Sequence, residues 1–175
     1  MTSPVSKQPP RNDQCVVSVL VEVPPDEAFR VFSEEIDAWW RRGLRYRLGR
    51  QRSVVHLEPK LGGRLFESFE SKTGNRIVET GRVTLWQPAE RLVLEWRAVN
   101  FAPSERTEVE VVFQPTKSGT LVTVTHRGWS RLPDDHPVRH GKEAASFMRQ
   151  MGLWWGGLAG ALREHILAAH SSKAE

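Results

Sequence analysis

The sequence of 175 residues has one cysteine, one tyrosine and no long apolar run. The lone Cys15 excludes an internal disulfide and a multi-cysteine metal cluster, so a reducing cytoplasm is the expected location. No apolar run approaches the ~18–20 residues that a membrane-spanning helix needs. Residues 1–14 lack the apolar centre of a secretory signal and are expected to form a disordered leader.

Familiar catalytic motifs are missing as well. The sequence contains no G-x-S-x-G, no H-E-x-x-H, no phosphate-binding G-x-x-x-x-G-K and no dinucleotide-binding G-x-G-x-x-G. The segment 134–140 places two aspartates near His136 and His140, but the prolines within and before it disfavour a helix that holds both histidines on one face. We therefore expect no metal and no cofactor, name no catalytic residue, and do not favour an enzyme.

The charge balance is only mildly basic. The formal net charge is +4, because 25 basic residues face 21 acidic ones, and this excess does not by itself indicate a nucleic-acid partner. Hydrophobic residues make up 39% of the chain, which is enough for a globular core. The unusual feature is the presence of seven tryptophans, whose rings supply large packing areas.

Hydrophobic periodicity predicts one strand, two short helices, six further strands and one long helix. Two short helices are expected after the first strand, the earlier one capped by Asp26. The predicted strands are 15–23, 53–58, 64–70, 76–86, 91–99, 106–114 and 120–127, and the helical segments are 28–32, 34–40 and 141–169. An alternating sheet must bury its apolar face, and the terminal helix is the largest apolar stripe available. The fold class is therefore α+β: a seven-stranded curved antiparallel sheet wrapped around a long C-terminal helix, forming one domain over 15–169 with a tail at 170–175.

Several local motifs occur in the order found in a known superfamily. They are VEVPPDEAF at 21–29, PKLGGRLFE at 59–67, GRV at 81–83, WQPAERLVLEW at 86–96, GTLVTVTHRGW at 119–129, and the helix from Met151. The chain resembles the START-related helix-grip superfamily (SRPBCC), and more specifically the proteins similar to the activator of the ninety-kilodalton heat-shock protein ATPase. The resemblance implies a cavity between the sheet and the long helix. It leaves function open, because this fold hosts lipid carriers, hormone receptors, cyclases and co-chaperones.

His126 is the most interesting polar residue. It shares a strand face with Val122 and Val124, and this face is expected to be the concave one. The residue can be a structural histidine bonded to a neighbour, a ligand contact, or a general base. Glu67 and Glu79 also lie on predicted apolar faces, so each either pairs with an arginine or lines a wet cavity.

The tryptophan doublets 39–40 and 154–155 fall where such a cavity has its lid and floor. Adjacent helical residues point about 100° apart, so one member of each doublet faces the core and the other covers a rim. These rings either pack the core or form an aromatic wall for an apolar ligand. The candidate ligand-binding residues are Trp40, Glu67, Glu79, Trp96, His126, Trp129, Met151 and Trp155.

The segment 41–52 holds six arginines and no acidic residue. It is expected to be a solvated loop or a contact for an anion or a partner. The candidate contacts in this loop are Arg41, Arg42, Arg45 and Arg47. Our main hypothesis is the non-catalytic binding of a small, largely hydrophobic molecule by a monomer or weak homodimer. The alternatives are a co-chaperone-type module that contacts a protein such as a chaperone, and a cyclase-like or hydrolase-like enzyme that uses His126.

Overall fold

The computed structural model describes residues 8–50 and 52–174. Within these described residues, seven strands, three α-helices and two 3-10 helices follow one another. They are β1 (Cys15–Val21), α1 (Pro25–Glu34), α2 (Ile36–Trp39), β2 (Val54–Leu57), β3 (Arg64–Ser71), β4 (Gly74–Gln87), β5 (Arg91–Trp96), β6 (Thr107–Thr116), β7 (Gly119–Arg127), η1 (Trp129–Arg131), η2 (Pro137–Arg139) and α3 (Ala144–Ser171). The residues 1–7, 51 and 175 lie outside this description, and with them most of the expected leader.

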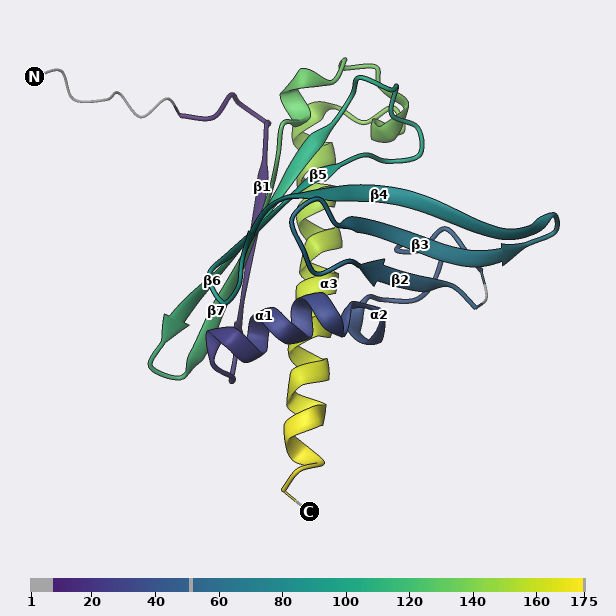
Figure 1. Cartoon of the computed structure of the whole chain (residues 1–175). Helices are drawn as coiled ribbons and strands as arrows, with labels where there is room; N and C mark the ends of the chain where they lie inside the picture. The colour runs from purple at the N-terminus through teal and green to yellow at the C-terminus, as the bar shows by residue number, and fades with distance from the viewer. Residues whose placement is uncertain (1–7, 51, 175) are drawn as a thin grey trace, which may run out of the picture.

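All seven strands form one antiparallel sheet in the order β1-β7-β6-β5-β4-β3-β2. The sheet curves around α3, and α1 packs against β6 and β7 (Figure 1). This arrangement confirms the predicted α+β helix-grip architecture, including the two short helices after the first strand. No helix among the described residues has both the length and the apolar character needed to cross a bilayer.

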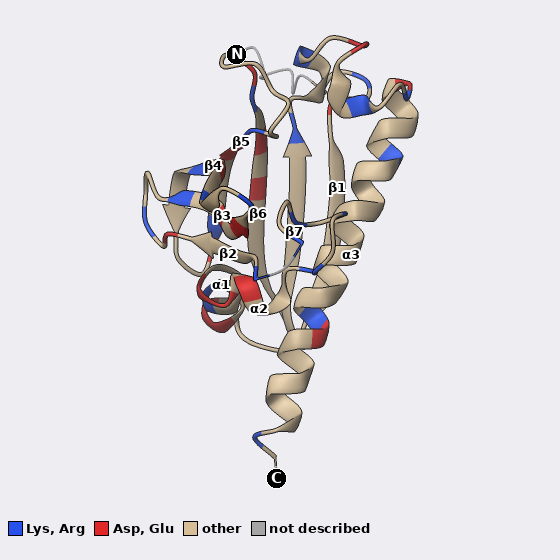
Figure 2. Ribbon diagram, turned by 90° about the vertical axis from the view of Figure 1, so that its right-hand side faces the viewer, with Lys and Arg blue, Asp and Glu red and all other residues tan. Residues whose placement is uncertain are grey.

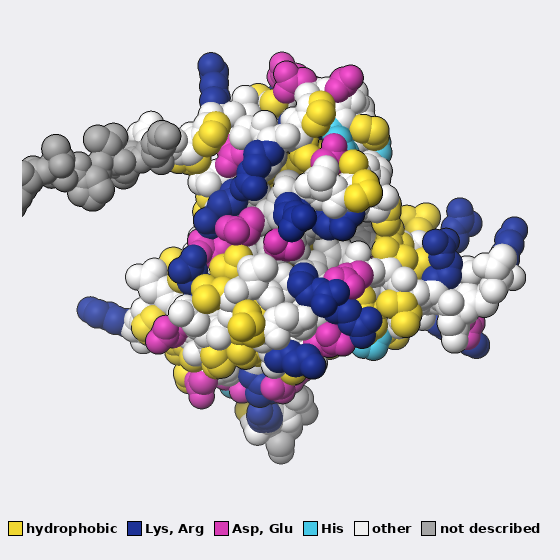
Figure 3. Space-filling model, turned by 45° about the horizontal axis from the view of Figure 1, so that its top comes forward, with side chains coloured by type: hydrophobic (Ala, Val, Ile, Leu, Met, Phe, Trp, Pro, Cys, Tyr) yellow, Lys and Arg dark blue, Asp and Glu magenta, His cyan; other side chains and the backbone are white. Residues whose placement is uncertain are grey.

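Alternation along the strands decides which side of the sheet is buried. Val109 pairs with His126 and Val111 with Val124, and the inward side chains of β6 and β7 are buried against α3. The charged side chains on the outward face are paired: Arg127 donates to Glu110, which also pairs with Arg91. Figure 3 shows the resulting mixture of basic and acidic side chains over the face that it presents.

Two expectations about chain ends and caps require correction. Asp26 does not cap α1; Pro24 occupies the cap position without a side-chain hydrogen bond. Asp13, placed by the sequence in the leader, is buried and accepts hydrogen bonds from the backbone of Gly128 and from the backbone and hydroxyl of Ser130. Asp13 therefore packs with the fold.

Candidate functional site

Four tryptophans pack together where the sheet meets the middle of α3. Trp40 follows α2, Trp96 ends β5, and Trp154 and Trp155 lie on α3. Each ring contacts the other three, with centroid separations from 5.1 to 6.5 Å. Below this tryptophan cluster, the space between β7 and α3 holds a void of only about 10 Å³. The tryptophans therefore fill the centre of the sheet–helix interface, where the sequence led us to expect a cavity.

A cavity of about 200 Å³ opens on the outer side of the tryptophan cluster. It lies between the arginine loop (residues 41–50), strands β2 to β5 and Trp154. Its walls are mainly apolar and include Trp40, Val55, Leu65, Trp96, Ala98 and Val99. Glu67 and Thr80 supply polar groups. Aromatic and aliphatic walls with a few fixed polar groups are typical of small-molecule sites. We call this cavity the mouth pocket.

Glu67 is the buried carboxylate of the mouth pocket. Its Oε2 accepts from the Leu48 N–H at 2.8 Å, and its Oε1 accepts from the Gly49 N–H at 2.9 Å and the Ser53 hydroxyl at 2.5 Å. The arginine pairing that we considered for Glu67 is absent among the described residues. Neutral donors hold it instead, two from the arginine loop and one from Ser53 just after it, so this carboxylate ties the loop to β3. Oε2 carries fewer of these bonds than Oε1 and can also accept a ligand N–H or O–H.

His126 lies on the concave face, as its period-2 spacing predicts, but it does not line the mouth pocket. Its Nδ1 accepts from the Trp155 indole N–H at 3.1 Å, which places the ring proton on Nε2. Nε2 then donates to the Thr107 hydroxyl at 2.7 Å. Complete burial lowers the pKa of His126 to about 3, so the ring is neutral. With both ring nitrogens engaged, His126 has the geometry of a structural histidine and offers no free lone pair to a substrate.

Glu79 does not face the concave side of the sheet. Leu65 pairs with Gly81 but Phe66 pairs with Glu79, so β4 contains an extra residue, Thr80, at this point. Such a bulge reverses the alternation beyond it. Thr80 consequently lines the mouth pocket, whereas Glu79 is 39% exposed and pairs with Arg82 at 2.6 Å. A period-2 count along the sequence could not detect this inserted residue.

Arg47 is the buried member of the arginine loop. Its guanidinium donates to the Asp37 carboxylate at 2.6 Å and to the Trp40 carbonyl at 2.7 Å, with further bonds to the backbone. Burial raises the pKa of Asp37, but the Val55 N–H and the guanidinium of Arg47 outweigh it and hold that pKa below its usual value. Arg47 therefore organises the loop and is not available to a partner.

The other predicted arginine contacts are exposed. Arg41 donates to the Gly157 carbonyl on α3 at 2.7 Å. Arg42 lies 3.5 Å from Asp37 and remains 67% exposed. The guanidinium of Arg45 lies 5.9 Å from the centre of the Tyr46 ring. Of these three exposed cations, only Arg45 lines the mouth pocket.

Two predicted ligand residues belong to a separate packing region. Trp129 is buried with Phe101 and Phe147 under the loop that precedes α3. Met151 is partly buried between this region and the main core. Neither lines the mouth pocket. Conversely, Trp154, Thr80 and Leu65 line it without having been named as ligand residues, although the doublet 154–155 had marked the position of Trp154.

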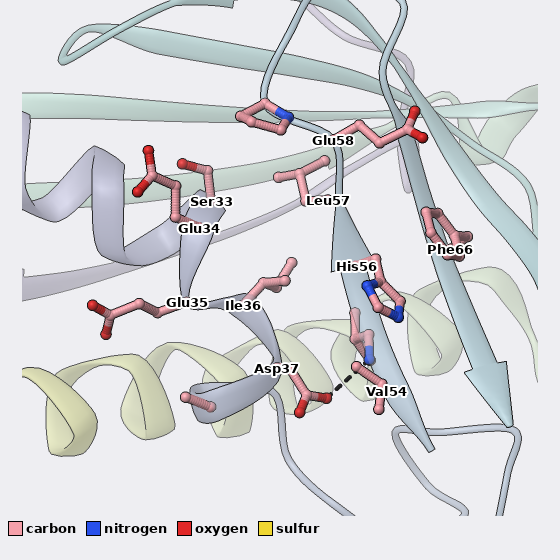
Figure 4. Close-up of a pocket in the computed structure, with 13 residues that line it drawn as sticks. Ser33, Glu34, Glu35, Ile36, Asp37, Val54, His56, Leu57, Glu58 and Phe66 are labelled. Carbon is pink, nitrogen blue, oxygen red and sulfur yellow. Dashed lines mark hydrogen bonds between the residues drawn. The ribbon is translucent and has the colours of Figure 1, made fainter. Parts of the chain in front are cut away.

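A larger hollow of about 590 Å³ lies between α1, α2 and β2. Figure 4 shows that it is an open groove: Glu35 and Glu58 point away from each other, and His56 turns toward Phe66. Asp37 accepts from the Val55 N–H, which covers part of the exposed edge of β2. The groove therefore has no convergent polar groups, and the smaller mouth pocket is the better candidate site.

Comparisons with known proteins agree with this fold. The family model of activator of Hsp90 ATPase homolog 1-like protein matches residues 22–152. No curated protein matches the chain. The solution structure of ChR145 from Cytophaga hutchinsonii is similar at 13% identity, with a TM-score of 0.63 and coverage of 90% of this chain and 96% of that one.

Two further solved structures share the architecture at low identity. The Aha1 dimer from Colwellia psychrerythraea is 15% identical, with a TM-score of 0.58 over 87% of this chain and 95% of that chain. CalU16 from Micromonospora echinospora is 16% identical, with a TM-score of 0.55 over 87% of this chain and 75% of that chain. The order of elements, the curved sheet around α3 and the match over residues 22–152 lead to one conclusion: the chain belongs to the family of activator of Hsp90 ATPase homolog 1-like proteins.

Proposed function

We propose that the protein binds a small, mainly apolar molecule in the mouth pocket, without catalysing a reaction. The supporting observation is the cavity of about 200 Å³, with Trp40, Trp96 and Trp154 in its wall. These rings can contact a flat or aliphatic ligand, and Glu67 can orient a hydroxyl or amine at its polar end. A reducing, cytoplasmic location fits the single buried thiol of Cys15.

Blocking the cavity should abolish binding. Ala98 lines the mouth pocket, whereas Ala102 is an exposed residue of the same loop that does not line it. Ala98→Phe should fill the entrance, and Ala102→Phe adds the same ring outside it. Titration with 1-naphthol, followed by tryptophan fluorescence, should show saturable quenching for the wild type and Ala102→Phe but not for Ala98→Phe.

Thermal unfolding gives an independent measure of the same binding. A ligand at 100 times its Kd stabilises the fold by about 2.7 kcal/mol, which raises the Tm by several degrees. Native mass spectrometry of freshly purified protein would reveal a retained natural ligand. Equal 1-naphthol binding by Ala98→Phe and Ala102→Phe would contradict the assignment of the pocket.

A second candidate function is a co-chaperone-type contact with another protein, acting as a monomer or weak homodimer. It is supported by the family match and by the exposed cations Arg41, Arg42 and Arg45. A charged contact of this kind depends strongly on salt. Arg42→Glu, at an exposed arginine that does not line the mouth pocket, should then weaken binding to an Hsp90-type ATPase and leave 1-naphthol binding intact.

A further inference from the structure

The entrance of the mouth pocket carries exposed aliphatic side chains. Leu44 is 59% exposed, Leu48 41% and Val99 68%, and all three line the pocket. Scattered apolar residues on a surface are ordinary, whereas a group at one entrance is typical of an interaction site. Leu44 and Leu48 come from the arginine loop, and Val99 comes from the connection between β5 and β6.

The loop that borders this entrance is basic. Residues 41–50 include five arginines and no acidic residue, and Figure 2 shows this loop after α2 with blue segments and no red one. Arg42, Arg45 and Arg50 are all exposed. Arg45 lines the pocket with the three aliphatic side chains, and Arg42 and Arg50 belong to the same exposed loop; we call this set the mouth rim: Leu44, Leu48, Val99, Arg42, Arg45 and Arg50.

The backbone of the mouth rim is held from inside. The Trp154 indole N–H donates to the Arg45 carbonyl at 2.8 Å, and the Trp40 indole N–H donates to the Tyr46 carbonyl at 3.1 Å. Tyr46 also stacks on Trp154 with ring centroids 5.6 Å apart. The aromatic rings therefore face the pocket, while aliphatic and cationic side chains face outward on a preformed loop.

We propose that the mouth rim docks reversibly on an anionic lipid surface, with the pocket entrance facing the bilayer. Aliphatic side chains insert at the boundary of the acyl chains, and arginines contact the headgroups around them. Single-stranded nucleic acid needs outward aromatic rings on which bases stack, and the one ring of this loop, Tyr46, stacks on Trp154. An acidic protein surface would match the arginines but leave the three aliphatic side chains without a partner. Docking does not require an occupied cavity.

The test is cosedimentation of the full chain with lipid vesicles. Vesicles of phosphatidylcholine alone are compared with vesicles in which about one third is phosphatidylserine. We expect binding only to the anionic vesicles, decreasing with salt. The single variants Arg42→Gln and Arg45→Gln should each weaken binding to anionic vesicles about fivefold. The double variant with Leu44→Gln and Leu48→Gln should weaken binding to anionic vesicles about tenfold or more.

Matched controls separate docking from general effects of charge and hydrophobicity. Leu61 is 67% exposed in the turn between β2 and β3, and Arg76 is exposed on β4; neither lines the mouth pocket. Leu61→Gln and Arg76→Gln should bind as the wild type does. Because all these side chains are exposed, unchanged Tm values should accompany every variant.

Three results would overturn the proposal. The first is equal binding to neutral and anionic vesicles. The second is loss of binding in Leu61→Gln and Arg76→Gln as large as in the mouth-rim variants. The third is arginine-dependent binding to polyglutamate or to a poly-dT strand, with no binding to anionic vesicles.

Discussion

Acidification should destabilise the protein through His126. In the folded state this ring is neutral, because burial lowers its pKa to about 3, whereas an unfolded chain has a histidine pKa near 6.5. Below pH ~6.5 His126 is therefore protonated in the unfolded state but stays neutral in the folded state. The stability contributed by the neutral ring is fully present above that pH and is lost as the pH falls toward 3. The limiting slope is about 1.4 kcal/mol per pH unit, or about 1 kcal/mol between pH 6 and pH 5.

The measurement is urea unfolding at pH 7, 6 and 5, followed by tryptophan fluorescence, for the wild type and His126→Gln. The glutamine can still donate to Thr107 but cannot titrate, and the Trp155 N–H loses its acceptor, which costs about 1–3 kcal/mol at every pH. The stability difference between the two proteins should shrink by about 1 kcal/mol from pH 6 to pH 5. Other histidines, such as His165 beside Glu35, cancel in this difference. A difference that does not change with pH would refute the neutral, buried state of His126.

Two further pairs of variants test the packing of the arginine loop. The Cβ added by Gly160→Ala lies in open space on α3, and alanine favours a helix over glycine by about 1 kcal/mol, so this variant should raise the Tm by about 2–4 °C. Gly157→Ala should lose this gain, because its Cβ would meet the hydroxyl of Tyr46 in the arginine loop. Thermal unfolding by circular dichroism checks this, and equal gains would contradict the contact. Arg47→Met should lower the free energy of unfolding by about 3 kcal/mol, because it leaves Asp37 without its buried partner. Arg42→Met should lower it by less than about 1 kcal/mol, because that arginine is exposed. Urea unfolding distinguishes the two, and equal losses would show that the buried arginine is not the main partner of this carboxylate.

Strand and helix positions followed from local patterns. The alternation of Val109 and Val111 predicted the buried face of β6, and the change to helical spacing predicted α3 to within a few residues of its bounds. These features depend on side chains two to four positions apart, so a short segment contains the whole signal. Among the glycines of α3, Gly157 lies against the Tyr46 hydroxyl of a loop far away in sequence, whereas a Cβ at Gly152, Gly156 or Gly160 would meet nothing.

The candidate site was less accessible to sequence reasoning. The extra residue in β4 turned Glu79 outward and Thr80 inward, and the register between two strands is a property of their pairing. The sequence suggested that Glu67 needed a partner, but the partners proved to be backbone N–H groups of a distant loop. Every residue except proline has a backbone N–H donor, so the residue types in the sequence do not indicate which of them will bind Glu67.

The sequence by itself determined the curved antiparallel sheet, the terminal helix and the family, because periodicity and ordered motifs are local properties of the chain. Only the tertiary structure decided where the cavity lies. Four tryptophans, one directly after α2, one on β5 and two on α3, meet and close the centre of the sheet–helix interface, leaving space beside the arginine loop. Whether large side chains fill or border a space depends on how segments far apart in sequence approach one another, and that approach is set by the packing of the whole fold.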